Sequence, residues 1–401
     1  MTRYAIIIPT RNRPGSLRMT LMGLAELDYL DVSLVVSDNS DAGVLDENSR
    51  MIEETLKGRR HIHVRPGRVL PMADHWNFAL DATPDADFFG IVTDRMMLMP
   101  AALSICDEVL SKSDQEAVCF KNGVVCSKTG TALPDMPSGI SARVVESDAV
   151  LDDFAKTILR KDSPRFLNSF VSRSCISRIK QRYGTVFAGI SPDYAFAFRF
   201  LDTTDRYASI DAPILIDHSP SVSNGMAMTR NIGNAAAKDF LHRAASEQSS
   251  ELAFGPIPFE TTLLPNVILR ELEIAKSRAN EATRLPVIDT GAFHVACAKA
   301  MRRSVRFFDP HSQRLAALIE EYRVAHGLPH LSARVRRTTF LRAVKNTVSR
   351  WVKMLLGTSS DLAGVLRDEK GDLELLTNLR NIGHTHAVSV PDRRLRDGET
   401  Q

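Results

Sequence analysis

The chain has 401 residues, a length typical of two domains or of one large domain with an addition, and 44% of the residues are hydrophobic while 25% are charged. These are the values of a folded globular protein, and they exclude a collagen-like, a wholly disordered or a disulfide-scaffold protein. The net charge of +3 is too small to require a nucleic-acid partner.

The cysteines and the longest apolar runs indicate the compartment. Five cysteines are scattered without a C-x-x-C pair, which argues against a disulfide framework and against a zinc ribbon. No uncharged apolar stretch approaches the roughly 18 residues of a membrane-spanning helix, and the first residues do not resemble an export signal. We therefore expect a protein of the reducing cytoplasm.

The first hundred residues alternate between short apolar runs and helical patterns. Buried strands are expected at residues 5–8, 32–36, 61–65 and 88–92. Ser16 is expected to cap a first helix, and Pro71 to open a helix whose Met72, Trp76 and Leu80 share one face. This alternation predicts β-α-β units with a ligand at the carboxyl ends of the strands.

The next stretch continues the alternation less regularly. We expect helices at residues 101–110 and 176–183, strands at 117–120, 166–171 and 208–216, and a hairpin at 124–130. A further helix is expected through Val150, Phe154 and Ile158. Ser191 and Pro192 predict the N-cap and first residue of a helix.

The predicted fold is an α/β domain over residues 1–230, with a mainly parallel sheet and helices on both faces, followed by a mostly helical region over 231–390 and a flexible tail over 391–401. The segment from Leu331 to Leu356 has seven basic and no acidic residues beside an apolar stripe that includes Trp351. Such a helix either binds an anionic membrane surface or packs on the rest of the protein with its arginines in solvent.

Four stretches over about residues 4–225 resemble a family 2 glycosyltransferase with the GT-A fold. They are IIIPTRNRPGSL, VVSDNSD, MADHWNFALDA leading into DFFGIVTDRMMLMP, and ISPDY. The resemblance implies an enzyme that moves a sugar from a nucleotide-diphosphate sugar, most often a UDP-sugar, to an acceptor hydroxyl with inversion. It also implies a carbohydrate or lipid-linked acceptor and a role in polysaccharide or glycoconjugate synthesis.

The loop after the first strand is a candidate nucleotide site. Backbone N–H groups and the guanidinium groups of Arg11 and Arg13 can meet an anionic ligand there, although a solvated turn would use the same residues. By the resemblance, Pro9, Thr10 and Arg11 line the nucleobase and ribose. Asp38 at the end of the second strand would accept a hydrogen bond from the base; it would also form an Asx turn, and both can hold together.

Asn77, Asp94 and Arg95 are the next nucleotide-binding candidates. Asn77 lies where the family often has an Arg-Asn pair, although His75 and Trp76 precede it here. The family usually has two or three acidic residues at Asp94, so the single carboxylate weakens a metal site and could bind the ribose instead. Arg95 could place a positive charge near the diphosphate, or form an ion pair with a neighbouring acidic residue.

By the resemblance, a divalent cation, Mn²⁺ or Mg²⁺, would be held by Asp94 and by His218, which follows the last strand of the domain, where GT-A enzymes can have a histidine ligand. The alternative for His218 is a hydrogen-bonded structural histidine beside Asp217. Asp193 is the candidate general base, since a carboxylate in the first turn of a helix is favoured in its ionised form. Acidic residues are also common there for helix stability alone.

The sequence therefore predicts an inverting glycosyltransferase, cytoplasmic and at the inner face of a membrane if the basic helix binds lipid. One alternative is a nucleotide-sugar-binding or assembly protein that has lost turnover together with the acidic metal motif. A weaker alternative is a nucleotidyltransferase, whose usual Gly-rich loop after the first strand is missing here. The sugar, acceptor, linkage and oligomeric state stay open.

Overall fold

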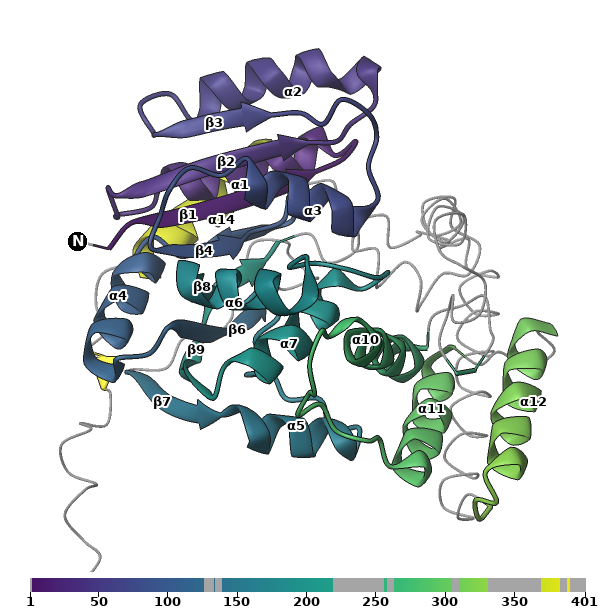
Figure 1. Cartoon of the computed structure of the whole chain (residues 1–401). Coiled ribbons are helices and arrows are strands. Elements are labelled where there is room, and N and C mark those ends of the chain that lie inside the picture. Colours follow the sequence, from purple (N-terminus) through teal and green to yellow (C-terminus); the bar gives the residue numbers. More distant parts are fainter. Residues whose placement is uncertain are drawn as a thin grey trace, which may run out of the picture.

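The structure is a computed structural model that describes residues 2–125, 133, 139–218, 256–257, 263–304, 310–330, 369–382 and 388–389. Its strands are β1 (Tyr4–Thr10), β2 (Val32–Asp38), β3 (His61–Val64), β4 (Phe88–Ile91), β5 (Met96–Leu98), β6 (Ala117–Val124), β7 (Ile140–Glu146), β8 (Ser169–Ser172), β9 (Arg206–Asp217) and β10 (Val388–Ser389). Within these residues they form one sheet in the order β10-β7-β9-β6-β8-β4-β1-β2-β3, and β5 pairs with β9 (Figure 1).

The described helices surround that sheet. They are α1 (Pro14–Ala25), α2 (Ala42–Thr55), α3 (Met72–Asp81), α4 (Ala102–Ser113), α5 (Ser147–Ala155), α6 (Arg173–Tyr183), α7 (Pro192–Thr203), α10 (Leu264–Arg278), α11 (Thr290–Ser304), α12 (Pro310–Ala325) and α14 (Glu369–Ile382). None of them is long and apolar enough to cross a membrane.

The strands β3, β2, β1 and β4 run parallel, as the apolar runs of the sequence predict. The chain builds β1, β2 and β3 in one direction across the sheet and then returns to add β4 on the other side of β1. The order of the strands therefore reverses between β1 and β4. In an open α/β sheet such a reversal leaves a crevice at the carboxyl ends of the two strands, where ligands bind.

The sheet changes direction at β8, which lies antiparallel between β4 and β6. Beyond it β6 and β9 are parallel to each other, while β7 and β5 pair antiparallel with β9. The mainly parallel sheet with helices on both faces confirms the predicted α/β class. The antiparallel strands explain why the alternation in the sequence becomes irregular after residue 100.

Two apolar clusters cover the two faces of the sheet, and β1 contributes to both because its side chains alternate. Ala5 and Ile7 belong to the cluster with α3, α5, α6, α7 and α10. Ile6 and Ile8 belong to the cluster with α1, α2, α4 and α14. The described C-terminal helices therefore share the core of the sheet rather than forming a separate one.

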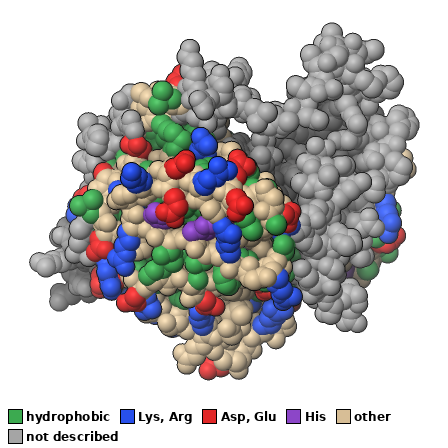
Figure 2. Space-filling view, turned by 90° about the horizontal axis from the view of Figure 1, so that it is seen from above, with side chains coloured by type: hydrophobic (Ala, Val, Ile, Leu, Met, Phe, Trp, Pro, Cys, Tyr) green, Lys and Arg blue, Asp and Glu red, His purple; other side chains and the backbone are tan. Residues whose placement is uncertain are grey.

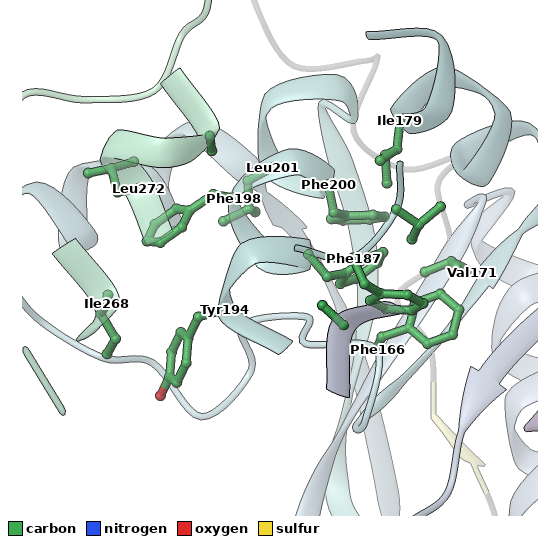
Figure 3. Packing of buried hydrophobic residues seen from close by; sticks show 14 of the residues in the cluster. Phe166, Val171, Ile179, Phe187, Tyr194, Phe198, Phe200, Leu201, Ile268 and Leu272 are labelled. Atoms are coloured by element: carbon green, nitrogen blue, oxygen red, sulfur yellow. The ribbon is translucent and has the colours of Figure 1, made fainter. Parts of the chain in front are cut away.

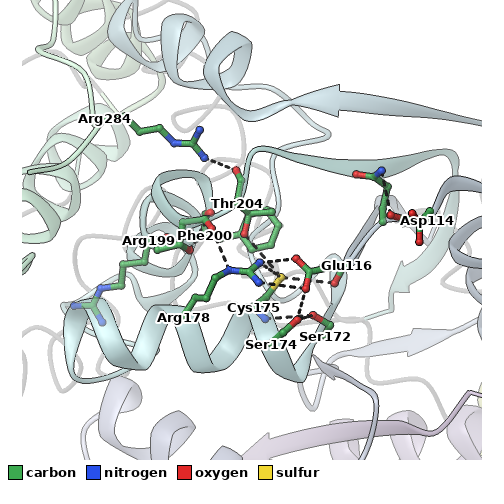
Figure 4. A network of polar contacts seen from close by, with 12 residues as sticks. Asp114, Glu116, Ser172, Ser174, Cys175, Arg178, Arg199, Phe200, Thr204 and Arg284 are labelled. Atoms are coloured by element: carbon green, nitrogen blue, oxygen red, sulfur yellow. Dashed lines mark hydrogen bonds and ion pairs between the residues drawn. The ribbon is translucent and has the colours of Figure 1, made fainter. Parts of the chain in front are cut away.

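A polar network fixes α6 beside the sheet (Figure 4). The Arg178 guanidinium donates to both carboxylate oxygens of Glu116, just before β6, at 3.2 and 2.7 Å. Its Nε donates to the carbonyl oxygen of Thr203 at the end of α7. This arginine thereby joins α6, α7 and β6.

Figure 2 shows the face of the molecule that carries α2 and β3. Acidic and basic side chains are mixed over its described surface, in keeping with the small net charge. The predicted domain boundary near residue 230, the basic segment 331–356 and the tail 391–401 lie outside the described residues. So does most of the hairpin expected at 124–130.

Two local predictions were wrong. The first helix begins at Pro14 with Arg13 as N-cap, because proline is already suited to the first helical position, so Ser16 lies inside the helix. Helix α5 ends at Ala155, and Ile158 is 51% exposed beyond it. The sequence analysis did not predict α2, β5 or β7.

Candidate functional site

The ends of β1 and β4 meet in a buried hydrogen bond. The Thr10 hydroxyl, on the last residue of β1, donates to Asp94 Oδ2 at 2.9 Å. Asp94 follows β4 in a tight turn in which the Met96 N–H donates to the Thr93 carbonyl oxygen at 3.0 Å. Thr10 is 2% exposed and Asp94 is 3% exposed. Two of the predicted nucleotide-binding residues are therefore in contact where β1 and β4 end.

Arg13 brings a positive charge to the same carboxylate. Its guanidinium lies 3.4 Å from Asp94 Oδ1, and its side chain is about a quarter exposed, at 28%. Both Asp94 oxygens thus accept a contact from the β1 loop. Each carboxylate oxygen has a second lone-pair position, so Asp94 can still bind a ligand hydroxyl or a cation.

The loop after β1 is held against the loop after β2. Asn12, at φ 54°, lies in the left-handed region, which asparagine tolerates. Its side chain donates to Asp41 Oδ2 at 2.7 Å and accepts from the Asp41 N–H at 2.9 Å. Arg11 donates to the Asn39 carbonyl oxygen and to Asp41 Oδ1, both at 3.2 Å. Pro9 is buried in β1 opposite Ser37.

Asp38 closes the Asx turn that the sequence predicts. Its Oδ1 accepts from the Ser40 N–H at 2.9 Å, and its Oδ2 accepts from the Asn48 amide of α2 at 2.9 Å. His63 Nε2 lies 3.9 Å from the same Oδ2. Asp38 is 1% exposed, so a base would have to reach it through the lone pairs that these contacts leave.

Three predicted residues are engaged by other groups. The Asn77 amide donates to the Phe187 carbonyl oxygen at 2.9 Å and accepts from the Phe187 N–H at 3.1 Å, which ties α3 to the loop before α7. Arg95 forms an ion pair with Asp217. His218 donates its N–H to the Arg95 carbonyl oxygen at 3.0 Å, and its Nε2 lies 3.0 Å from the Thr20 hydroxyl.

His218 lies beside the turn over residues 93–96 that carries Asp94. Thr20 contacts both, because its hydroxyl lies near the His218 ring and 3.4 Å from the Thr93 carbonyl oxygen. Among the described residues no three His, Cys, Asp or Glu side chains gather as a metal site. The donors present fit a cation shared with a diphosphate, since Mg²⁺ commonly takes one or two carboxylates and completes its shell with phosphate and water.

Asp193 lies in the first turn of α7, whose N-cap is Ser191 as predicted. The Ser191 hydroxyl donates to Asp193 Oδ1 at 2.9 Å instead of capping a backbone N–H. The carboxylate is partly exposed. It can therefore meet a ligand while one of its oxygens is held.

Arg165 lies close to Asp193, and the sequence analysis missed it. Its guanidinium lies 5.7 Å from the centre of the Tyr194 ring. Burial lowers the pKa of Arg165, but Tyr194 and Asp193 more than offset this, and the pKa lies above its usual value. The next residue, Phe166, accepts the N–H of Ile91 at 3.2 Å, at the end of β4. These contacts place Arg165 between the start of α7 and the end of β4.

Glu271 of α10 was also missed, although it contacts the loop before α7. No short motif marks either residue. Arg165 stands in an irregular segment, and Glu271 lies within Glu-Leu-Glu of a helix whose acidic residues would be expected in solvent.

No protein-family model matches the chain, and no curated protein matches it. Among solved structures, the chain is similar to S. aureus TarS 1–349 in complex with UDP-GlcNAc, at 12% identity and a TM-score of 0.45, over 82% of this chain and 93% of that chain. It is also similar to the mannosyltransferase PcManGT from Pyrobaculum calidifontis in complex with GDP-Man and Mn²⁺, at 15% identity and a TM-score of 0.42, over 88% and 87%. At this identity and TM-score, neither the substrate nor the residue roles of those proteins can be assigned to this chain.

Proposed function

We propose that the protein is an inverting glycosyltransferase that uses a nucleotide-diphosphate sugar. The observation that carries the proposal is the buried Thr10–Asp94 hydrogen bond at the point where the strand order reverses. Asp38 lies at the end of the neighbouring strand, and Asp193 lies in the first turn of α7, beside the Arg165–Phe166 segment that contacts the end of β4. In this proposal the strand ends would supply the polar groups for a nucleotide, and Asp193 would supply a separate carboxylate for proton transfer.

The nucleotide would lie over the ends of β1 and β2. Asp38 would accept a hydrogen bond from the base, and Arg11 would face the ribose and phosphates together with Arg13. Asp94 would bind the ribose hydroxyls or one divalent cation, Mn²⁺ or Mg²⁺, that the diphosphate also coordinates; such a cation neutralises charge on the leaving diphosphate. Arg95 would bind the ligand only if the ligand displaced Asp217 from it, and His218 only if the ligand displaced Thr20.

Asp193 would act as the general base. It would take the proton of the acceptor hydroxyl while that oxygen forms a bond to the anomeric carbon. The bond from the anomeric carbon to the diphosphate oxygen breaks in the same step, and the nucleoside diphosphate leaves with the electron pair.

A second candidate function is nucleotide-sugar binding without turnover. The specific observation that favours it is that Asp94 is the one carboxylate of its turn and has both oxygens engaged. In this case the nucleotide would bind as above, and no sugar would be transferred.

One experiment separates the two functions. The purified protein is incubated with UDP-, GDP- and dTDP-sugars, with and without Mn²⁺, and both thermal stability and nucleoside diphosphate release are measured. A bound donor at a hundred times its Kd adds about 2.7 kcal/mol of stability. Stabilisation with release supports the transferase, and stabilisation without release supports the binding protein. No stabilisation by any donor would contradict both.

A further inference from the structure

The loop over residues 184–191 leads into α7, and a carboxylate from α10 fills the space beside it. Gly189 has φ +72°, and a Cβ there would lie 1.8 Å from Glu271 Oε2 and 2.5 Å from its Cδ. Gly189 is therefore required twice, for its backbone conformation and for the close approach of Glu271. An alanine would have to displace the carboxylate.

Glu271 is fully buried and acts as an acceptor for this loop. Its Oε1 accepts from the Ile190 N–H at 3.0 Å and from the Ser191 N–H at 3.2 Å. The same oxygen accepts from the Arg270 guanidinium at 2.7 Å. These are N–H groups just before a helix, where the helix itself supplies no acceptor.

Apolar packing holds Glu271 at this position. Ile268 and Leu272 of α10 belong to the same buried cluster as Tyr194, Phe198 and Leu201 of α7, and the close view shows them between the two helices (Figure 3). The two helices bring the carboxylate to the loop as one packed unit.

The loop is thus fixed from two sides. Asn77 of α3 binds both backbone groups of Phe187, and Glu271 binds the N–H groups of Ile190 and Ser191. Ser191 in turn donates to Asp193 Oδ1. A continuous series of hydrogen bonds therefore runs from α10 to the candidate base.

We propose that Glu271 is a positioning residue of the transfer reaction, which sets where Asp193 presents its carboxylate to the acceptor. The proposal rests on the proposed function and extends it: a residue of the C-terminal region would take part in the site without contacting the substrate. Donor binding at β1 and β2 should not depend on it.

The electrostatic surroundings supply an independent readout. Burial raises the pKa of Glu271 to about 7, against the opposing effect of Arg270 and the two backbone N–H groups. Arg199 of α7 also acts on it, and residues 184–191 carry no ionisable side chain. The carboxylate therefore gains a proton on going from pH 8 to pH 6, and the protonated form is the weaker acceptor.

The test compares Glu271→Leu, which removes the acceptor, with Glu271→Gln, which keeps one oxygen. Glu273→Leu is the matched control, because Glu273 lies on the same helix and binds Lys276 instead of the loop. Donor Kd and the transfer rate at saturating donor are measured for each from pH 6 to 8. Amide hydrogen exchange of residues 187–191 is measured in parallel.

We expect Glu271→Leu to lower the rate at least about tenfold while donor Kd stays within about twofold, since it removes an ionised acceptor from two N–H groups. Glu271→Gln should match the low-pH rate of the wild type and lose the rate change near pH 7. Exchange at Ile190 and Ser191 should rise in Glu271→Leu alone. The Glu273→Leu control should behave as the wild type.

The inference is overturned if the wild type and Glu271→Gln have the same pH profile and Glu271→Leu keeps its rate. If Glu271→Leu does not fold, the pH profiles of the transfer rate for the wild type and Glu271→Gln decide whether the inference holds. An absence of transfer in the wild type contradicts the proposed function instead, and the exchange measurement still reports whether Glu271 holds the loop.

Discussion

At the scale of single residues, the site is defined by hydrogen bonds between loops rather than by one dense motif. The Asp94 carboxylate accepts a hydrogen bond from Thr10 and pairs with Arg13. The Asp38 carboxylate accepts a hydrogen bond from Asn48, and the Asp193 carboxylate accepts one from Ser191. Asp94 and Asp38 keep their orientation because a group from another segment binds each of them, and Asp193 keeps its orientation through the N-cap residue of its own helix. Small changes at those second groups should therefore affect ligand binding without unfolding the protein.

Thr10→Val tests this for Asp94. Valine keeps the shape but leaves Asp94 Oδ2 without its donor, so we expect donor Kd to rise about two- to tenfold, the equivalent of roughly 0.5–1.5 kcal/mol. Calorimetric titration with the donor measures it. Thr83→Val is the matched control, because Thr83 donates to a helix carbonyl oxygen away from the site. Equal affinities for the two variants would remove Thr10 from the nucleotide site.

Asp193→Asn tests the proposed general base. An amide keeps the shape of the side chain but cannot take the proton, so the transfer rate should fall about 100- to 10,000-fold with donor Kd unchanged. Rates are measured at saturating donor. Asp205→Asn is the control, since Asp205 is exposed just beyond the same helix. A variant that keeps most of its rate would assign the base to another carboxylate, with Asp211 and Asp217 next.

At the scale of helices and strands, the sequence predicted those elements whose apolar pattern is strong. The runs in β1, β2 and β4 are buried along almost their whole length, and α7 begins where Ser191 and Pro192 indicate. Helix α2 was missed because its buried residues, Asn48, Met51 and Ile52, form no apolar stripe. Strand β5 has only three residues, too few for a periodic signal.

The residues of the candidate site also fall into those that the sequence could predict and those that it could not. Residues that follow a predicted strand, such as Asp38 and Asp94, could be found because parallel strands bring their carboxyl ends to one edge. Arg165 and Glu271 could not be found, because they reach the site through contacts between segments distant in sequence. Glu271 contacts a loop some 80 residues earlier, and no local pattern encodes that distance.

At the scale of the whole molecule, a buried histidine makes stability depend on pH. Burial lowers the pKa of His75 to about 4 from its ordinary 6.5, while the Ser37 hydroxyl lies 2.9 Å from its Nε2. The unfolded chain then binds more protons than the folded one between those values, so His75 favours folding above pH 6.5 and opposes it as the pH falls towards 4.

His75→Gln should remove this dependence. The free energy of unfolding of the wild type, relative to the variant, should rise by roughly 3 kcal/mol between pH 4 and pH 7, as the shift in pKa requires. Urea unfolding at each pH measures the difference. The comparison of the two proteins also cancels the contribution of Glu271 to the pH dependence of stability. The raised pKa of Glu271 acts in the opposite direction and favours folding at low pH. A difference that does not vary with pH would show that His75 titrates normally.

The shared core predicts the result of shortening the chain. A protein of residues 1–230 lacks α10 and exposes the apolar side chains of α7 that Leu269 and Leu272 cover. We expect it to melt at a lower temperature than the full chain and to bind a hydrophobic dye. Residues 1–330, which retain α10, α11 and α12, should bind less dye. Equal melting temperatures for 1–230 and the full chain would mean that the first 230 residues fold alone.

The contact between α10 and the loop before α7 also has a consequence for synthesis. A ribosome that has just added Ser191 adds about 80 more residues before it reaches Glu271, which takes roughly 4 to 16 s at about 5–20 residues per second. During that interval the ribosome adds α7 and then β9, but the nascent chain still lacks the acceptor for Ile190 and Ser191. Those N–H groups are left to water, and the apolar side of α7 that α10 covers in the folded protein stays uncovered until α10 is made.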